Sequence, residues 1–167
     1  MLLTTLAAIS LGTPAFTGPR IEVRVENKGR FIISTDSKGS PKTVKHILNL
    51  VSKKFYDAQT FHRVENWVVQ WGDPGSRTPD NPEVGDGGSG KDIPFEESKV
   101  EFVRGTVGVA STGLKVGGDS QLFILTQDAA RLNGNYAVVG RVTHGMEVVD
   151  VLERNDRILS LRVLKRR

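Results

Sequence analysis

The residues most able to do chemistry lie in the stretch FHRVENWVVQ, residues 61–70. Arg63 and Gln70 are a charged and an amide side chain inside what is expected to be two short strands joined by a turn. Alternation along a strand places Arg63 on the same face as Phe61, and Gln70 on the same face as Val68. A solvent-facing location on edge strands is the ordinary explanation of such a pair. An inward-facing arginine, by contrast, is costly unless it has a function, because its charge loses water.

Other kinds of chemistry find little support in the chain. The sequence contains no cysteine, which excludes disulfides, thiol nucleophiles and cysteine-based metal sites. The three histidines, His46, His62 and His144, are scattered rather than spaced as metal ligands. No serine lies in the G-x-S-x-G pattern of a hydrolase nucleophile. The sequence therefore predicts no metal and no cofactor.

A glycine-rich stretch at residues 85–91 matches the G-x-x-x-x-G-K pattern of a phosphate-binding loop. The pattern then requires Ser or Thr, where this chain has Asp92, and Pro94 prevents a helix from starting directly after it. A calcium loop counted from Asp80 fails as well, because Pro82 falls at a position that needs an oxygen ligand. We interpret the glycines as allowing an exposed loop to fold tightly.

Composition is that of one soluble globular domain. The chain has 167 residues, 38% hydrophobic and 25% charged, with a net charge of +4. Basic residues gather only in the tail at 165–167, and no basic stripe is interleaved with aromatic residues. We therefore expect a solvated surface, no nucleic-acid partner and a monomer, with the domain covering residues 18–167.

Residues 1–17 resemble a secretory signal peptide. The apolar run at 2–11 is too short to span a bilayer, and Ala15-Phe16-Thr17 resembles a cleavage site. We therefore predict an extracytoplasmic location, in the periplasm or cell envelope. No Lys or Arg precedes Arg20, however, so a structural N-terminal extension and a cytoplasmic location stay open. No other segment is apolar enough to cross a membrane.

The hydrophobic pattern predicts a mainly β fold. A helix is expected from Pro41, with Ser40 as its N-cap, and a second short helix is expected to open at Thr143. A long loop covers residues 72–98. The strands are expected at residues 20–27, 30–35, 61–64, 67–71, 106–111, 121–126, 137–142 and 158–165. Eight strands without strand–helix alternation indicate a closed antiparallel barrel, capped by the two helices.

Several segments with potential site residues follow one another in a fixed order. They are Phe61-His62-Arg63, Gln70 with Gly72-Asp73-Pro74, SQLFI at 120–124, LNG at 132–134 and VGRV at 139–142. In this order and spacing the chain resembles the cyclophilins, the prolyl cis/trans isomerases, from residue 21 to residue 165. The family fold implied by the resemblance is an eight-stranded antiparallel barrel with two helices, which agrees with the pattern of the elements.

The resemblance also implies which residues form the site. Arg63 matches the catalytic arginine, Gln70 the glutamine beside it, and Phe123 the floor of a proline pocket. Arg63 would then point inward, onto the floor of a groove. The positions carried over as substrate-binding are His62, Trp67, Val68, Ala110, Ser111, Gln121, Phe123, Leu132 and Tyr136. The implied partners are proline-containing peptides and folding proteins, and the implied activity is rotation about X–Pro bonds.

This chain departs from the family pattern in three places. The turn between Arg63 and Gln70 is one residue shorter, which makes the assignment of Trp67 less secure. Arg131 stands where many members have an aromatic residue that contacts cyclosporin, so we expect weak inhibition by that drug. The loop at 75–92 does not follow the usual sequence, and no functional residue is assigned in it. These departures leave a second hypothesis open, a non-catalytic module that binds proline-containing segments of a partner.

Overall fold

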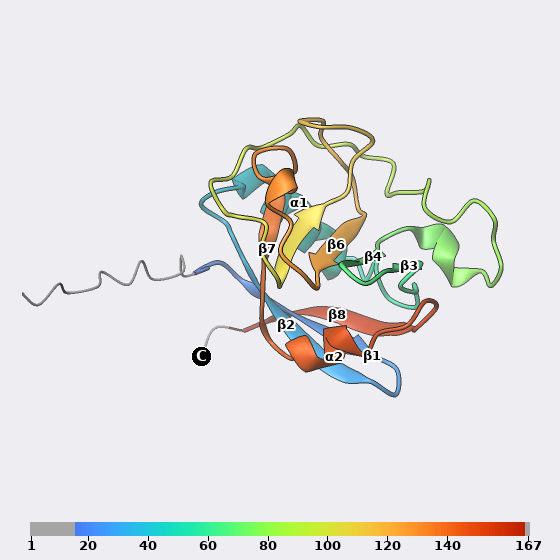
Figure 1. Ribbon diagram of the computed structural model, residues 1–167. Coiled ribbons are helices and arrows are strands. Elements are labelled where there is room, and N and C mark those ends of the chain that lie inside the picture. Colours follow the sequence, from blue (N-terminus) through green and yellow to red (C-terminus); the bar gives the residue numbers. More distant parts are fainter. Residues whose placement is uncertain (1–15, 166–167) are drawn as a thin grey trace, which may run out of the picture.

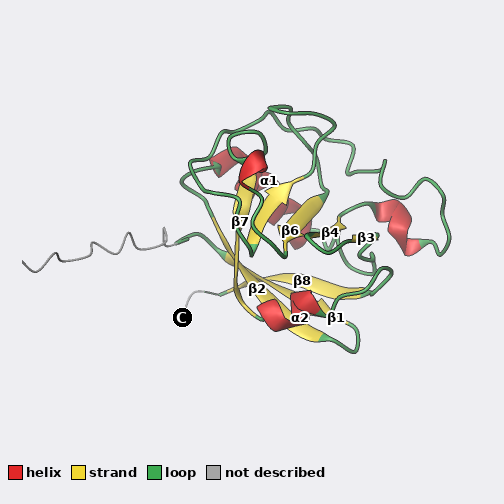
Figure 2. Cartoon of the chain, in the orientation of Figure 1, coloured by secondary structure: helices red, strands yellow, loops and turns green. Residues whose placement is uncertain are grey.

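A computed structural model describes residues 16–165 of the chain. The predicted leader at residues 1–17 therefore lies almost wholly outside the described residues. Eight strands form one sheet (Figures 1 and 2). They are β1 (Arg20–Val25), β2 (Gly29–Thr35), β3 (Arg63–Val64), β4 (Val68–Trp71), β5 (Thr106–Val109), β6 (Leu122–Leu125), β7 (Val138–His144) and β8 (Ile158–Leu164).

The sheet is antiparallel throughout and curls into a barrel. Its strand order is β3-β4-β6-β5-β7-β2-β1-β8, so β3 and β8 lie at its two ends. No ladder joins these end strands within residues 16–165. The segment before β3 meets the beginning of β8 instead, since the Ala58 N–H donates to the Ile158 carbonyl at 2.9 Å and Thr60 forms an isolated bridge with Arg157. The predicted eight-stranded antiparallel barrel is confirmed, with this short seam in place of full closure.

Helix α1 (Pro41–Ser52) packs against β8 and β7, as its apolar stripe predicts. Ser40 is the N-cap residue and proline follows it, as predicted, but the Ser40 side chain makes no capping hydrogen bond. The carboxylate of Glu96 caps the helix instead. It accepts hydrogen bonds from the backbone N–H groups of Lys42 and Thr43 at 3.1 and 2.7 Å. A side chain from the long loop thus satisfies the free donors of the first turn.

Helix α2 (Met146–Asp150) is a single short turn that packs against β2. Thr143, expected to open this helix, lies in β7 instead. Gly145 precedes the helix with φ of 80°, a left-handed conformation that glycine adopts at little cost. Two short 3₁₀ helices, η1 (Pro74–Arg77) and η2 (Ala130–Leu132), lie in the connections.

Buried apolar side chains form two separate clusters. The larger fills the barrel and includes Phe31, Phe61 and Trp71, all with 0% exposure; we call it the barrel core. The smaller lies on the other face of β4 and β6, and we call it the Phe123 cluster. Its buried members are Val68, Phe102, Phe123, Leu125, Ala129 and Val138.

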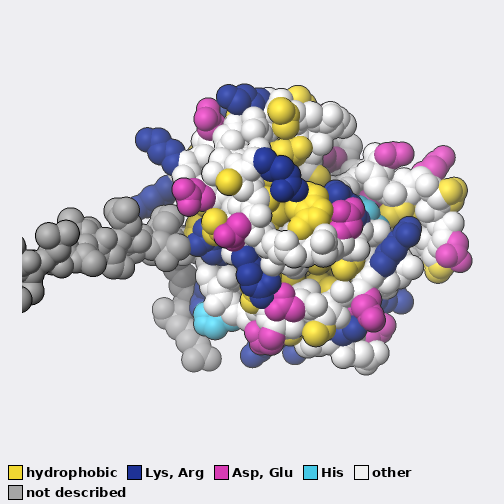
Figure 3. Space-filling model, in the orientation of Figure 1, with side chains coloured by type: hydrophobic (Ala, Val, Ile, Leu, Met, Phe, Trp, Pro, Cys, Tyr) yellow, Lys and Arg dark blue, Asp and Glu magenta, His cyan; other side chains and the backbone are white. Residues whose placement is uncertain are grey.

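The surface carries charges of both signs, intermixed over the face seen in Figure 3. Hydrophobic side chains gather in the middle of that face, with Lys, Arg, Asp and Glu side chains around them. Among residues 16–165, the helices are all too short or too polar to cross a bilayer.

Candidate functional site

Arg63, Gln70 and Phe123 lie side by side across three neighbouring strands. Arg63 of β3 pairs with Gln70 of β4, and Gln70 pairs with Phe123 of β6. Residues paired in this way point to the same face of a sheet. The next neighbour in the row is Gly108 of β5. The sheet thus places a guanidinium, an amide and an aromatic ring in one line.

This row lies on the outside of the barrel. Val69 and Trp71 alternate with Val68 and Gln70 along β4 and point into the barrel core. Arg63 therefore does not point inward, and its side chain is 41% exposed. Phe61 lies in the barrel core, so its predicted face-sharing with Arg63 is also wrong. The alternation fails there because β3 begins only at Arg63.

A directed chain of hydrogen bonds fixes the polar side chains of the row. Arg63 Nη1 donates to Gln70 Oε1 at 3.1 Å, and Gln70 Nε2 donates to Gln121 Oε1 at 2.8 Å. Gln121 Nε2 in turn donates to the carbonyl oxygens of Gly85 and Gly87 at 2.6 and 2.8 Å. Each amide accepts from one neighbour and donates to the next, which leaves one orientation for each. The guanidinium of Arg63 is thereby tied to the long loop.

An apolar wall adjoins this polar chain. The ring of Phe123 meets Tyr136 edge-on, with the centroids 5.8 Å apart, and stacks on Phe102 at 5.8 Å. Leu132 is half-buried against the same cluster, and Val68 lies beneath it. Gly108 makes room for the Phe123 ring, because a Cβ at that position would lie 2.5 Å from Phe123 Cζ. The structure thus brings four of the predicted substrate-binding residues together as one aromatic and aliphatic surface.

Trp67 lies beside Arg63 in spite of the shortened turn. Its indole ring lies 5.5 Å from the Arg63 guanidinium and 4.4 Å from that of Arg131, both within cation–π distance. The ring also packs against the Phe123 cluster. Trp67 is therefore part of the site, and Arg131 covers it. The expectation of weak cyclosporin binding stays a prediction, now with Arg131 placed at the site.

Ala110, Ser111 and Gln121 line a cavity of about 740 Å³ that begins at Gln70. The rest of its lining comes mainly from the glycine-rich loop at 85–94 and from residues 116–120. The Ser111 hydroxyl donates to the Gly113 carbonyl at 2.7 Å, so it stabilises its own turn. We call this cavity the Gln121 pocket. It continues the site beyond the Arg63 row.

Two carboxylates hold the loop that forms this pocket. Asp73 accepts hydrogen bonds from the backbone N–H groups of Gly75, Gly85 and Gly87 at 2.7, 2.6 and 3.0 Å. Asp119 accepts from Gly90 at 2.8 Å, and also from Ser89 and His46. The amides of the phosphate-loop look-alike thus bind the protein's own carboxylates.

The ionisation of Asp73 follows from these contacts. Burial raises the pKa of its carboxyl, but the three backbone donors outweigh burial and hold the pKa below its ordinary value. The charged form is therefore favoured at neutral pH. Asp73 positions Gly85 and Gly87, which accept from Gln121, so the loop and the Arg63 row are one connected unit.

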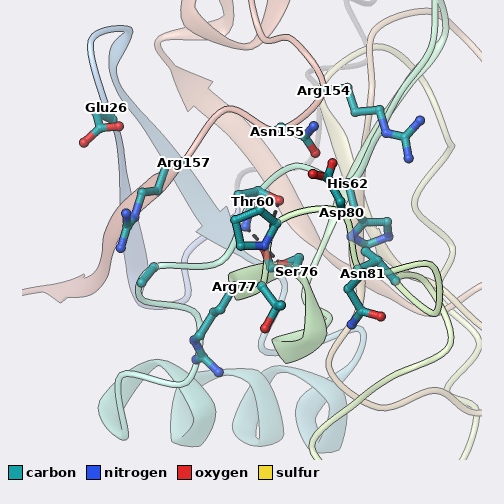
Figure 4. A pocket seen from close by; sticks show the side chains of 14 residues that line it. Glu26, Thr60, His62, Ser76, Arg77, Asp80, Asn81, Arg154, Asn155 and Arg157 are labelled. Atoms are coloured by element: carbon teal, nitrogen blue, oxygen red, sulfur yellow. Dashed lines mark hydrogen bonds between the residues drawn. The ribbon is translucent and has the colours of Figure 1, made fainter.

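His62 directly precedes Arg63, and its imidazole lies within electrostatic range of Gln121 and Arg63. It lines a second cavity, of about 330 Å³, in which none of the other predicted site residues takes part (Figure 4). Burial lowers the pKa of the His62 imidazole, which favours the neutral ring. Both ring nitrogens are buried without a hydrogen-bond partner among the described residues. The side chains of Arg77, Arg154 and Arg157 spread around different sides of this cavity rather than converging.

Sequence reasoning missed several residues that build the site. Asp73 and Asp119 anchor the loop, Phe102 supports Phe123, and Glu65 binds Arg63 Nε at 2.7 Å. Asp119 and Phe102 act over long sequence distances and leave no local pattern. Glu65 could have been found, because a carboxylate two residues from an arginine across a tight turn is close enough to pair. Within residues 16–165, no group of three or more His, Asp or Glu side chains could hold a metal ion.

Comparison with known proteins agrees with this geometry. A family described as cyclophilin-type peptidyl-prolyl cis-trans isomerase matches residues 20–165. The chain belongs to the cyclophilin family. A probable peptidyl-prolyl cis-trans isomerase of Brucella abortus is 41% identical over 121 residues, which cover 69% of this chain and 62% of that protein. A peptidyl-prolyl cis-trans isomerase of Synechococcus elongatus is 32% identical over 140 residues, covering 82% of this chain and 91% of that protein.

Solved structures show the same fold. A cyclophilin-type isomerase of Cryptosporidium parvum superposes with a TM-score of 0.78 at 23% identity, covering 89% of this cyclophilin chain and 99% of that one. A second structure of the Cryptosporidium protein, obtained in the presence of the dipeptide Ala-Pro, gives a TM-score of 0.76 at 22% identity, covering 88% and 99%. The cyclophilin fold predicted from the sequence is therefore confirmed.

Proposed function

We propose that this cyclophilin catalyses cis/trans isomerisation of X–Pro peptide bonds at the row formed by Arg63, Gln70 and Phe123. The observation that carries the proposal is their pairing across β3, β4 and β6. A guanidinium fixed by an amide stands next to an apolar aromatic surface there. Such a surface suits the proline ring, and the guanidinium suits the polar peptide group attached to it.

The chemistry requires no nucleophile, because only rotation about the amide bond takes place. Resonance makes the rotation barrier about 18–20 kcal/mol, and uncatalysed X–Pro exchange takes tens to hundreds of seconds. Twisting the bond localises the lone pair on the proline nitrogen. A donor aimed at that nitrogen is stronger in the twisted state than in the planar one, which lowers the barrier.

Arg63 is suited to this role. Its guanidinium is always charged and carries five N–H donors in a rigid fork. Its Nε donates to Glu65 and its Nη1 to Gln70, which leaves Nη2 for a substrate. A hydrogen bond from a charged donor contributes about 1.5–3 kcal/mol, or about one to two orders of magnitude in rate. Phe123, Leu132 and Tyr136 would hold the proline ring while the preceding carbonyl turns.

A protease-coupled isomerase assay on a proline tetrapeptide tests the proposal. We expect the unmodified protein to accelerate exchange and Arg63→Ala to lose about 10- to 100-fold of that acceleration. The variant should keep its circular dichroism spectrum, because Arg63 lies on the outer face and is 41% exposed. Full activity of the folded variant would contradict the assignment of Arg63.

The alternative is a non-catalytic module that binds proline-containing segments without accelerating cis/trans isomerisation of their X–Pro bonds. The contact that favours it is Arg131 on the Trp67 ring at 4.4 Å, which places a charge over the edge of the site. A protein that binds a proline peptide but leaves its exchange rate unchanged would establish this alternative. The retained row of Arg63, Gln70 and Phe123 favours the enzyme.

An extracytoplasmic location stays a prediction that rests on the signal-like pattern at residues 1–17. Clients there would be proteins folding in the periplasm or cell envelope. Fractionation of cells that express the full chain would decide between this location and the cytoplasm.

A further inference from the structure

One carboxylate in the shortened turn binds two residues of the site at once. Glu65 Oε1 accepts from Arg63 Nε at 2.7 Å, and Glu65 Oε2 accepts from Trp67 Nε1 at 2.9 Å. The two partners use different oxygens, so neither displaces the other. Glu65 thereby ties the guanidinium of Arg63 in β3 to the indole ring of Trp67, the residue just before β4.

The turn that carries Glu65 is itself firmly held. The Glu65 N–H donates to the Val68 carbonyl at 2.9 Å, and the Trp67 carbonyl accepts from the Thr126 N–H at 3.0 Å. The Asn66 carbonyl accepts from the side chains of Thr126 and Gln127, each at 3.0 Å. The carboxylate therefore extends from a backbone that has little freedom to move. A position fixed in this way can determine where a flexible neighbour lies.

Arg63 is the flexible neighbour. Its side chain is partly exposed and long, and an arginine in that situation samples many rotamers unless its head group is bound. Glu65 and Gln70 bind the guanidinium from two sides, at Nε and Nη1. Both contacts leave Nη2 available, and together they fix the plane of the fork. Donors that are already aimed before the substrate arrives lose less free energy on binding the transition state.

Electrostatics agrees with a charged Glu65. The hydrogen bond from Arg63 lowers the pKa of the Glu65 carboxyl, with further help from the positive charge of Arg63 and from Trp67. The second guanidinium, that of Arg131, lies on the same indole ring. Glu65 is thus an ionised group that binds one guanidinium and one indole N–H.

We propose that Glu65 is a positioning residue for Arg63, holding the guanidinium in the plane from which it reaches a twisted X–Pro bond. This inference rests on the proposed isomerase function and adds to it a residue specific to the shortened turn. Glu65 does not itself touch the substrate. Its removal should therefore lower the turnover rate more than it weakens substrate binding.

The chain offers a matched control for an exposed ion pair. Arg104 and Asp150 are also 2.7 Å apart, with side-chain exposures of 45% and 40%, against 41% and 45% for Arg63 and Glu65. That pair joins the start of β5 to α2 and includes none of the site residues. Glu65→Gln and Asp150→Asn therefore remove the same charge from similar ion pairs at different places.

The experiment measures kcat and KM for a proline peptide in the unmodified chain, Glu65→Ala, Glu65→Gln and Asp150→Asn. We expect about a two- to fivefold fall in kcat for both Glu65 variants, the range open to one exposed ion pair, with KM nearly unchanged. Asp150→Asn should match the unmodified chain. Nuclear magnetic resonance of the arginine side chains gives an independent readout, because the Arg63 Nε–H signal should be protected from exchange only while Glu65 is present.

Two results would overturn the inference. One is a Glu65→Ala variant with unchanged or raised kcat, and the other is an Arg63 Nε–H signal unaffected by that substitution. Failure of the proposed function looks different, because the unmodified chain would then show no isomerase activity. If that chain is active and Arg63→Ala is not, an unchanged Glu65→Ala removes the positioning role alone.

Discussion

The barrel core and the Phe123 cluster are built from the same strands, but the first stabilises the fold and the second forms part of the candidate site. Along β4, Val69 and Trp71 enter the barrel core, while Val68 and Gln70 face the other way. Along β6, Leu122 and Ile124 enter the core while Phe123 faces out. Because side chains alternate between the two faces of a strand, the inner face of the sheet packs the barrel core and the outer face carries the candidate functional site. The comparison teaches that stability and chemistry can be perturbed separately in this molecule.

The largest effect is expected in the barrel core. Trp71 has 0% exposure and packs on Phe61 with the ring centroids 5.6 Å apart. Trp71→Ala should lower the free energy of unfolding by about 3–5 kcal/mol, because it leaves a large cavity. Urea denaturation measures this change, with Leu159→Ala, an exposed position on β8, as the control that should stay within about 0.5 kcal/mol. A loss below about 1 kcal/mol for Trp71→Ala would show that the core is not packed as described.

Asp73 comes next, because it holds the loop that binds Gln121. Asp73→Asn should cost about 1.5–3 kcal/mol of stability, the contribution of hydrogen bonds to a charged group. It should also lower isomerase activity, since Gly85 and Gly87 would no longer be held for Gln121. Glu83→Gln in the same loop, where the carboxylate is exposed and lines neither cavity, is the matched control.

The same residue predicts a pH dependence. The folded pKa of Asp73 lies below its unfolded value, so its stabilisation is present above the unfolded pKa of about 3.9 and is lost as pH falls through the folded pKa. Unfolding of the unmodified chain should therefore become easier below about pH 4, and Asp73→Asn should show a shallower decline there. Equal slopes for the two proteins would contradict the role of the carboxylate.

The smallest effect gives the sharpest contrast between the regions. Phe31 in the barrel core and Phe123 in the site cluster are 0% and 5% exposed. Leucine at either position should cost less than about 1.5 kcal/mol of stability, since a bulky apolar side chain is kept. Only Phe123→Leu should lower kcat/KM, by about fivefold, because roughly 1 kcal/mol of ring contact is lost from the substrate surface. Equal activity losses in the two variants would show that the clusters are not functionally separate.

Much of the fold could be predicted because its signals are local. Strand alternation and the apolar stripe of α1 depend on neighbouring residues, and they predict most strands and the helix correctly. Alternation fails between Phe61 and Arg63, because β3 starts only at Arg63. The inward direction of Arg63, which the family resemblance implies, is wrong because the row lies on the outer face of the barrel. Ser40 is correctly placed at the N-cap, but the side chain that accepts from the first-turn N–H groups is Glu96, which is distant in sequence and could not be predicted.

The main residues of the site could be predicted from the sequence, but the residues that hold them in place could not. Arg63, Gln70 and Phe123 could be named from their order along the chain, and the register then brings them into one row. The anchoring of the glycine-rich loop by Asp73 and Asp119 joins backbone N–H groups to carboxylates, and backbone donors carry no sequence signal. The second cavity that His62 lines could not be foreseen either, because its other lining residues, such as Asn81 and Arg154, are distant in sequence.

If Arg63 acts as proposed, the planar guanidinium, and not its charge alone, accelerates rotation about X–Pro bonds at this row. Arg63→Lys keeps the charge and removes the planar fork. Two-dimensional exchange spectroscopy on a proline peptide measures binding and isomerisation in one sample. The unmodified chain should bring cis/trans exchange well below the tens of seconds of the free peptide, while Arg63→Lys shifts the peptide signals without comparable exchange. Equal exchange rates for the two proteins, or no acceleration by the unmodified chain, would contradict the account.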